Sequence, residues 1–178
     1  MNRADLRLED GIVALRRFRT GDSERLVELG DNPNVCRFLA NRFPSPYRPA
    51  DADAWITATA SETRPCNFAI EFEGTLIGGI GLEPLKDMHA GTAELGYWLG
   101  EPYWGKGLAT RAVRLMTDHA FGELLFVRLQ AIVIEKNNAS MRVLEKAGFA
   151  REGVMRKHIR KNGVMLDAHL YALLRGHH

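Results

Sequence analysis

The chain has 178 residues, which is long enough for one domain with a hydrophobic core. Its 24 lysines and arginines nearly balance 22 acidic residues, and a net charge of +2 without a basic stripe argues against a nucleic-acid partner. Two cysteines make neither a disulfide framework nor a metal site, and the absence of a signal-like start or membrane-length apolar run predicts a cytoplasmic protein with no membrane partner.

The first third of the chain predicts one strand and three helices. Alternating apolar residues indicate a strand over residues 12–19, whose arginines we expect on a solvated face: Arg16, Arg17 and Arg19. Asp22 is a candidate N-cap for a helix through residue 29. Pro33 begins a second, short helix, and Asp51 begins a third.

Two further strands, over residues 67–72 and 76–82, are predicted on either side of a tight turn at Glu73-Gly74. The glycine-rich stretch that follows the turn indicates close backbone packing rather than a phosphate site. Near the end of the chain, residues 154–160 and 164–174 flank Asn162-Gly163. This dipeptide favours a hairpin with a type I′ turn.

Residues 94–121 predict a strand, a short turn and a glycine-bearing loop that leads directly into an amphipathic helix. A helix start presents unpaired N–H groups and the positive end of the dipole, so it can bind phosphate without charged side chains. Gly105 and Gly107 would let the backbone approach such a group closely. The P-loop spacing is absent, and Thr110 stands where a dinucleotide fingerprint has its third glycine. An ordinary helix start is the alternative interpretation.

A second strand–loop–helix unit follows, with a strand over residues 127–134 and then a short helix. We expect this helix to begin at an asparagine cap, Asn137 with Asn138 as the alternative, and to end at Gly148 in the left-handed conformation. The two units, with asparagine before the second helix and Gly148-Phe149 after it, resemble the GNAT superfamily of N-acetyltransferases. The segment Ala-Glu-Leu-Gly-Tyr-Trp-Leu at residues 93–99, together with Asn137-x-x-Ser140, resembles the branch of N-terminal (alanine/serine) acetyltransferases of ribosomal proteins. The resemblance covers about residues 12–174.

This resemblance implies a single α/β (α+β) domain over residues 1–178, with its core at 12–174. The expected sheet is mixed, mostly antiparallel, of about seven strands, with splayed central strands and flanking helices. The implied cosubstrate is acetyl-CoA, without a metal. Its pyrophosphate would meet the loop amides, and its pantetheine arm would add to the open edge of the preceding strand. The expected cofactor-binding residues are Tyr97, Trp98, Leu99, Gly105, Lys106, Gly107, Leu108, Ala109, Thr110, Asn137 and Ser140.

The chemistry implied is attack of a neutral amine on the thioester, with a backbone N–H near residues 97–99 stabilising the oxyanion. Many relatives use a tyrosine seven residues after the motif asparagine to assist the thiolate, and Leu144 stands there instead. Ser140 matches the donor serine of the ribosomal-protein branch, although a helix-capping hydroxyl is the alternative. Glu94 is the candidate base, and His158, Asp167 and a water-mediated route stay open beside it.

One departure concerns the phosphate loop, which in the superfamily usually begins with glutamine or arginine. Trp104 stands in that position, and we expect it to pack on the adjoining surface while the amides still bind the pyrophosphate. The loss of this residue and of the tyrosine keeps a second function open, a non-catalytic acyl-CoA-binding sensor module.

The sequence does not name the acceptor amine. The branch resemblance suggests the α-amino group of a protein, while an aminoglycoside, a polyamine or an amino acid would need the same machinery. We expect acceptor specificity to lie in residues 31–65 and 156–169, since loops carry function on a rigid scaffold. Phe43 and Tyr47 either line this cleft or pack within their proline-rich turn. The expected assembly is a monomer or a homodimer.

Overall fold

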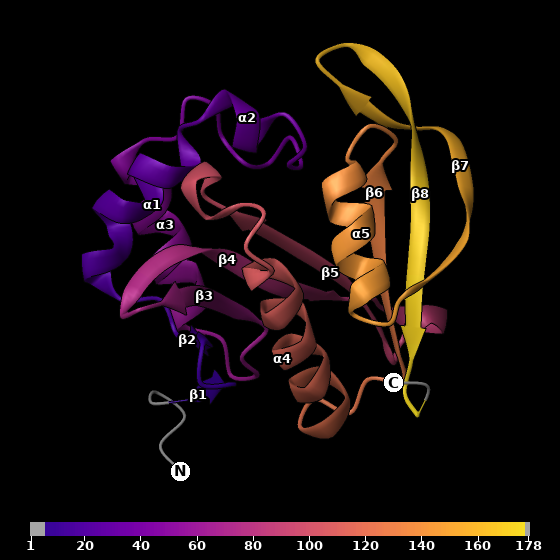
Figure 1. Ribbon diagram of the computed structural model, residues 1–178, viewed down its shortest axis with the longest axis horizontal. Coiled ribbons are helices and arrows are strands. Elements are labelled where there is room, and N and C mark those ends of the chain that lie inside the picture. The colour runs from indigo at the N-terminus through magenta and orange to yellow at the C-terminus, as the bar shows by residue number, and fades with distance from the viewer. Residues whose placement is uncertain (1–5, 177–178) are drawn as a thin grey trace. The chain divides into compact units, whose positions relative to one another are not determined.

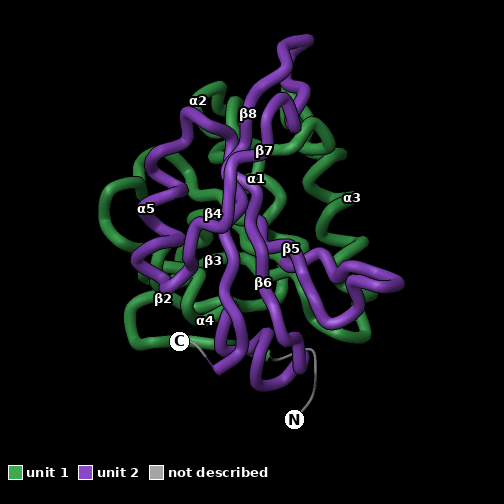
Figure 2. The backbone as a smooth tube through the Cα atoms, turned by 90° about the vertical axis from the view of Figure 1, so that its right-hand side faces the viewer, with its two compact units in different colours: residues 1–81, 97–116 green, residues 82–96, 117–178 purple. Residues whose placement is uncertain are grey.

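The structure, a computed structural model, describes residues 6–176 (Figure 1). It contains eight strands in the hydrogen-bonded order β1-β2-β3-β4-β5-β6-β8-β7, which makes the sheet one strand wider than predicted. The chain forms two compact units, residues 1–81 with 97–116 and residues 82–96 with 117–178 (Figure 2). Strands β4 (Thr75–Pro84) and β5 (Thr92–Leu99) and helix α4 (Leu108–Gly122) each run from one unit into the other.

The sheet of the first unit is antiparallel. Strand β1 (Arg7–Glu9) pairs with β2 (Val13–Arg16), β2 with β3 (Asn67–Phe72), and β3 with β4. The predicted turn between β3 and β4 is confirmed, because Glu73 and Gly74 both have positive φ, at 52° and 74°. Strand β1 was not predicted, since three residues are too few to establish an alternating pattern.

The helices of the first unit are α1 (Ser23–Gly30), α2 (Pro33–Cys36) and α3 (Pro49–Ala60). Helix α3 begins two residues before the predicted start, because Pro49 occupies the first helical turn, where its missing N–H costs nothing. Asp51 then accepts a hydrogen bond from the backbone N–H of Arg48, at 2.9 Å. Two short 3-10 turns, Thr20–Asp22 and Glu101–Tyr103, complete the unit.

The core of the first unit lies between its helices and its strands. Phe43 and Tyr47 belong to it, with ring centroids 4.6 Å apart and planes nearly parallel, so the packing interpretation of these two rings is the one the structure supports. Burial, and then Asp51, raise the pKa of the Tyr47 phenol to about 12. The other buried members of this core are Phe18, Leu26, Leu29, Ala52, Ile56, Ala69 and Leu76.

The expectation that Arg16 faces solvent is wrong. Only 5% of Arg16 is exposed, and its guanidinium donates to Glu71 at 2.6 Å and to both carboxylate oxygens of Asp22 at 2.8 Å. Asp22 therefore makes no side-chain cap for α1. Burial alone would raise the pKa of Glu71, but hydrogen bonds from Arg16 and Arg7 outweigh it and lower that pKa.

Close backbone packing at Gly78 is confirmed. A Cβ on this residue would overlap the carbonyl oxygen of Trp98 and lie 2.9 Å from the Cα of Leu99. Glycine is therefore required where β4 meets the end of β5, next to the hydrogen bond that Gly100 N–H donates to Ile77 at 2.9 Å. This contact fixes the segment that leads into the predicted phosphate loop.

In the second unit, β5 pairs in parallel with β6 (Arg128–Ile134), β6 in antiparallel with β8 (Val164–Leu174), and β8 in antiparallel with β7 (Ala150–Lys161). The β5–β6 ladder covers only Thr92–Glu94 of β5, which is a short pairing for strands of eight and seven residues. The short ladder agrees with the splayed central strands that the family resemblance implies.

The β7–β8 hairpin turns at Asn162 and Gly163, whose φ values of 49° and 80° confirm the predicted type I′ turn. Along β7 the register shifts twice, and the second shift leaves three residues of β7 opposite one residue of β8. Neither shift was predicted. The sequence pattern of a strand shows only which of its residues are apolar. A shift of pairing register within an exposed strand leaves that pattern unchanged, so the sequence gives no sign of it.

Helix α5 (Asn138–Lys146) begins and ends as the sequence predicts. Asn137 is its N-cap, and Gly148, at φ 95°, ends it in the left-handed conformation. The N–H groups of Gly148 and Phe149 donate to Glu145 and Leu144, which is the hydrogen-bond pattern of a Schellman motif. Tyr171 of β8 donates a hydrogen bond to Glu145 of α5 at 2.9 Å. The buried apolar residues of this unit include Leu129, Ala131, Val133, Leu144, Phe149, Tyr171 and Leu173.

Candidate functional site

The predicted phosphate loop is the entry to α4. Arg111 N–H donates to the carbonyl of Gly107 at 3.3 Å, so Gly107 is the residue from which the first helical hydrogen bond starts. Gly105 and Gly107 have φ values of 75° and 76°, and a Cβ on either would meet no atom within 4 Å. The loop backbone is therefore open to a ligand, and the first helical turn presents the unpaired donors of a helix N-terminus.

Buried side chains hold this helix start in place. Leu108 is 3% exposed and Thr110 is 7% exposed, so the first turn is anchored while the residues before it stay accessible. The salt bridge between Arg111 and Asp10, at 2.7 Å, ties the same turn to the segment before β2. The open loop and the anchored turn fit a diphosphate group, because amides can be preorganised around it without cost at binding.

Trp104 lies against its own loop, as predicted. Its indole N–H donates to the carbonyl of Leu99 at 2.8 Å, and 41% of the residue stays exposed. The ammonium of Lys106 lies 5.6 Å from the ring centroid of Tyr103, whose hydroxyl accepts a hydrogen bond from Arg25 at 2.6 Å. The Lys106 ammonium is thus held beside the glycine loop by a cation–π contact with the Tyr103 ring.

Asn137 and Ser140 form the second predicted set. The Asn137 Oδ1 accepts a hydrogen bond from the backbone N–H of Ser140 at 3.2 Å, so the asparagine side chain does the capping. Ser140 is partly exposed on the first turn of α5. Leu144, which replaces the tyrosine of many relatives, is fully buried in the core and offers no donor.

Glu94 lies on β5 opposite Gln130 of β6. Its neighbours Ala93 and Leu95 are buried, so alternation puts Glu94 on the other face of the strand, where it is partly exposed. His158 is exposed in the β7–β8 hairpin. Asp167 accepts a hydrogen bond from the backbone N–H of Lys157 at 2.7 Å, which shows a structural role for that carboxylate.

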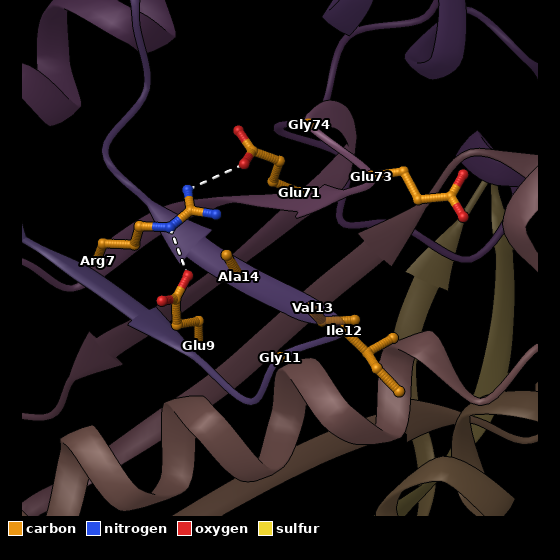
Figure 3. Close-up of a pocket in the computed structure, with 9 residues that line it drawn as sticks. All are labelled: Arg7, Glu9, Gly11, Ile12, Val13, Ala14, Glu71, Glu73 and Gly74. Carbon is orange, nitrogen blue, oxygen red and sulfur yellow. Dashed lines mark hydrogen bonds and ion pairs between the residues drawn. The ribbon is translucent and has the colours of Figure 1, made fainter.

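The structure divides the predicted site residues between the two units. Residues 97–99 and 105–110 belong to the first unit, and Glu94, Asn137 and Ser140 belong to the second. A surface depression of about 250 Å³ in the first unit contains none of these residues. It is lined by β1, β2 and the β3–β4 turn, and Figure 3 shows Arg7 between Glu9 and Glu71 there.

Within residues 6–176, no group of three or more histidine, cysteine or acidic side chains is arranged to hold a metal ion. Across the same residues, no helix combines the length and the apolar character that crossing a bilayer requires. Both cysteines, Cys36 and Cys66, are buried free thiols, and burial raises the pKa of the Cys66 thiol.

Residues 13–150 match the family described as "Acetyltransferase (GNAT) domain". This chain belongs to the GNAT acetyltransferase family. The prediction of an N-acetyltransferase is therefore confirmed, and with it the acetyl-CoA-dependent chemistry that defines the family. The open glycine loop at the start of α4 is the feature of this GNAT chain that fits a coenzyme A diphosphate.

Several relatives match most of this GNAT chain, among them two with named acceptors. The Bacillus subtilis "Putative ribosomal N-acetyltransferase YdaF" is 36% identical over 169 residues, 92% of the chain and 91% of the relative. The Escherichia coli spermidine N(1)-acetyltransferase is 30% identical over 160 residues, 88% of the chain and 82% of the relative. The Bacillus subtilis "Probable N-acetyltransferase YjcK" is 46% identical over 99 residues, about half of each protein.

Among solved structures, the ribosomal L7/L12 alpha-N-protein acetyltransferase RimL, crystallised with coenzyme A, has a TM-score of 0.84. It covers 95% of this chain and 98% of its own, at 18% identity, and so supports the fold alone. The predicted GNAT fold, with its mixed sheet and flanking helices, is confirmed.

Proposed function

We propose that this enzyme transfers the acetyl group of acetyl-CoA to the α-amino group at the N-terminus of a protein. The observation that carries the proposal is the 36% identity, over 92% of the chain, to the relative whose name assigns it to ribosomal proteins. We also propose that residues 1–178 act as one N-acetyltransferase domain, since three elements run from one unit into the other. Residues 1–5 and 177–178 of that range lie outside the described part.

The acetyl-CoA would be held mainly by backbone groups. In the proposal, the amides from Gly105 to Thr110 bind the diphosphate, and the backbone of residues 97–99 pairs with the pantetheine amides. Lys106 adds a positive charge at the loop. The Asn137 side chain, which caps α5 through one oxygen, has an NH₂ group left to donate to a pantetheine carbonyl.

The reaction needs three events at the acetyl group. A neutral amine attacks the thioester carbon, the carbonyl oxygen gains negative charge that a backbone N–H stabilises, and the C–S bond breaks. We propose that the Ser140 hydroxyl donates a proton or hydrogen bond to the departing thiolate. Glu94, or water it orders, takes the proton that the amine must lose.

A polyamine is the second candidate acceptor, because the spermidine acetyltransferase is also similar over most of the chain. An aminoglycoside or an amino acid would need the same transfer chemistry. The family match speaks against the non-catalytic acyl-CoA sensor that the sequence left open. These alternatives differ in which amine releases coenzyme A, and a sensor releases none.

The experiment is a panel of amines incubated with enzyme and acetyl-CoA, with free thiol as the readout. The panel contains short peptides beginning with alanine or serine, spermidine, an aminoglycoside and free amino acids. We expect the free-amine peptides to give the highest kcat/KM and their N-acetylated forms to give no thiol. Faster turnover of spermidine than of every peptide would reject the protein acceptor, and no turnover of any free-amine peptide would reject it as well.

A further inference from the structure

A wide bulge in β7 displays three consecutive basic residues. Met155 pairs with Ala168 and Ile159 with Leu166, so Arg156, Lys157 and His158 all lie opposite the single residue Asp167. We call these three residues the basic bulge. Bulges of this kind redirect side chains at the end of a sheet and often lie beside functional sites.

The bulge is held in a strained conformation by one carboxylate. Lys157 has φ 48°, a left-handed conformation that is unfavourable for a residue other than glycine. The Asp167 Oδ1 accepts a hydrogen bond from the Lys157 backbone N–H at 2.7 Å and so stabilises this shape. This hydrogen bond is made by the Lys157 backbone, and the part of the chain that the structure describes shows no ion pair between the Lys157 ammonium and Asp167.

The cations of the basic bulge lack internal partners. Within residues 6–176, the side chains of Arg156, Lys157 and His158 make no hydrogen bond or ion pair, and all three residues are exposed. Elsewhere among the described residues, several arginines do pair with carboxylates: Arg7, Arg16, Arg17, Arg25, Arg111 and Arg128. The bulge is therefore a place where positive charge is left for an external anion.

Residues next to the basic bulge in the sequence add further positive charge. Residues 153–167 contain two arginines, two lysines and one acidic residue, Asp167, giving a formal charge of +3 in a chain whose total is +2. In both views the hairpin tip extends past the end of β6 (Figures 1 and 2). Strand β7 is also the last strand of the sheet, so one side of its backbone is not paired with another strand.

We propose that the basic bulge of β7 binds the carboxylates of an acidic polypeptide acceptor, whose N-terminus the enzyme acetylates. The proposal rests on the proposed function and adds the class of acceptor. An extended peptide suits an open strand edge, and alternating acidic side chains suit the exposed arginine and lysine. Nucleic acid suits this surface less well, because β7 contains no phenylalanine, tyrosine or tryptophan on which a base could stack.

The test uses two serine-initiated peptides that differ only in their downstream residues, glutamate and aspartate in one, glutamine and asparagine in the other. For the wild type at low salt, we expect KM to be about tenfold lower for the acidic peptide, and we expect this preference to fade as salt rises. In the variant Arg156→Gln/Lys157→Gln the preference should fall to about twofold or less. Its kcat and its KM for acetyl-CoA should stay within about twofold of wild type.

Two variants separate charge from geometry. The control Lys86→Gln/Arg175→Gln removes the same charge from exposed sites of the second unit outside the hairpin and should retain the preference. Asp167→Ala retains every basic side chain but removes the hydrogen bond that stabilises the bulge. This variant should lose most of the preference for the acidic peptide. If the double bulge variant retains the full preference, or the control loses it equally, the charges only protect the strand edge from aggregation and the proposal is wrong.

A binding measurement separates this proposal from the proposed function. Fluorescence anisotropy with the N-acetylated acidic peptide, which cannot react, should give a Kd about tenfold lower for wild type than for the double bulge variant. This difference would support the bulge even if no free-amine peptide were acetylated. Equal affinities would reject it even if peptides were good substrates. Tighter binding of a single-stranded oligonucleotide of equal charge would reject the polypeptide in favour of nucleic acid.

Discussion

The structure shows which of Asn137 and Ser140 caps helix α5, a question that the sequence alone left open. The asparagine carboxamide oxygen accepts the backbone N–H of Ser140, so the cap of α5 depends on the serine backbone and not on its hydroxyl. The Asn137 side chain supplies the N-cap of α5, and the Ser140 hydroxyl is the donor that we propose for the departing thiolate. Leu144, one turn further along α5, is buried and leaves Ser140 as the candidate donor on this helix.

We predict that Ser140→Ala lowers kcat about 10²-fold while changing the Kd for acetyl-CoA less than about threefold. The reason is that a donor to the departing thiolate acts at bond cleavage and contributes little to ground-state binding. Steady-state kinetics and calorimetry measure the two quantities. Ser61→Ala, at an exposed serine after α3, is the matched control and should change neither. A parallel loss of kcat and affinity would instead make Ser140 a binding residue.

Single residues also show where prediction from sequence fails. Arg16 was expected in solvent because it alternates with apolar residues, yet it lies buried against Glu71, which is 55 positions away in the sequence. A lone arginine pattern cannot distinguish a solvated side chain from one paired with a distant carboxylate. Asn137 and Gly148 were predicted correctly because caps and stops act within a few residues of the helix end.

At the scale of elements, the β5–loop–α4 segment was predictable because each of its parts has a local signal. Gly105 and Gly107 mark the loop, and the apolar stripe marks the helix that begins at Leu108. Strand β1 and the register shifts of β7 had no comparable signal. Three residues establish no period, and the basic run that accompanies the bulge is also typical of an ordinary edge strand.

We predict that Gly107→Val raises the Kd for coenzyme A at least about tenfold, as measured by calorimetry. The Cβ meets no protein atom, so the added side chain would occupy the space above the loop where a phosphate must approach. The left-handed φ of 76° also costs a β-branched residue about 1–2 kcal/mol of stability.

Gly74→Val separates strain from ligand contact. Gly74 lies in the β3–β4 turn of the same unit, has φ 74°, and likewise leaves its Cβ position open. It should lose a similar amount of stability in thermal unfolding and retain the wild-type affinity for coenzyme A. If the two variants bind coenzyme A equally well, the phosphate-loop assignment is wrong.

At the scale of the whole molecule, the family and its acetyl transfer followed from two motif units, while the acceptor did not. The motifs near Gly107 and Asn137 are those that we propose for acetyl-CoA, the cosubstrate, so they contain no information about the amine. The acceptor depends on surfaces such as the basic bulge, whose shape comes from a register shift and a hydrogen bond across the hairpin. These are properties of the fold and not of any short motif.

The first unit carries its own buried charge network. Arg16 links Glu71 on β3 to Asp22 before α1, and Arg7 on β1 donates to the same glutamate at 2.9 Å. Removing one member of a buried pair leaves the other charge uncompensated. The network therefore joins three strands and a helix start, and its protonation state affects the stability of the unit.

We predict that acid weakens this protein partly through Glu71. Hydrogen bonds from two arginines lower its folded pKa, so its stabilisation is fully present above the unfolded value of about 4.3 and is lost as pH falls through the folded value. Glu71→Gln should cost about 3 kcal/mol near pH 7 and flatten the fall in Tm below about pH 4.5. The exposed Glu73→Gln should keep the wild-type curve. If Glu71→Gln and wild type lose Tm in parallel on acidification, the buried pair is not the acid-sensitive group.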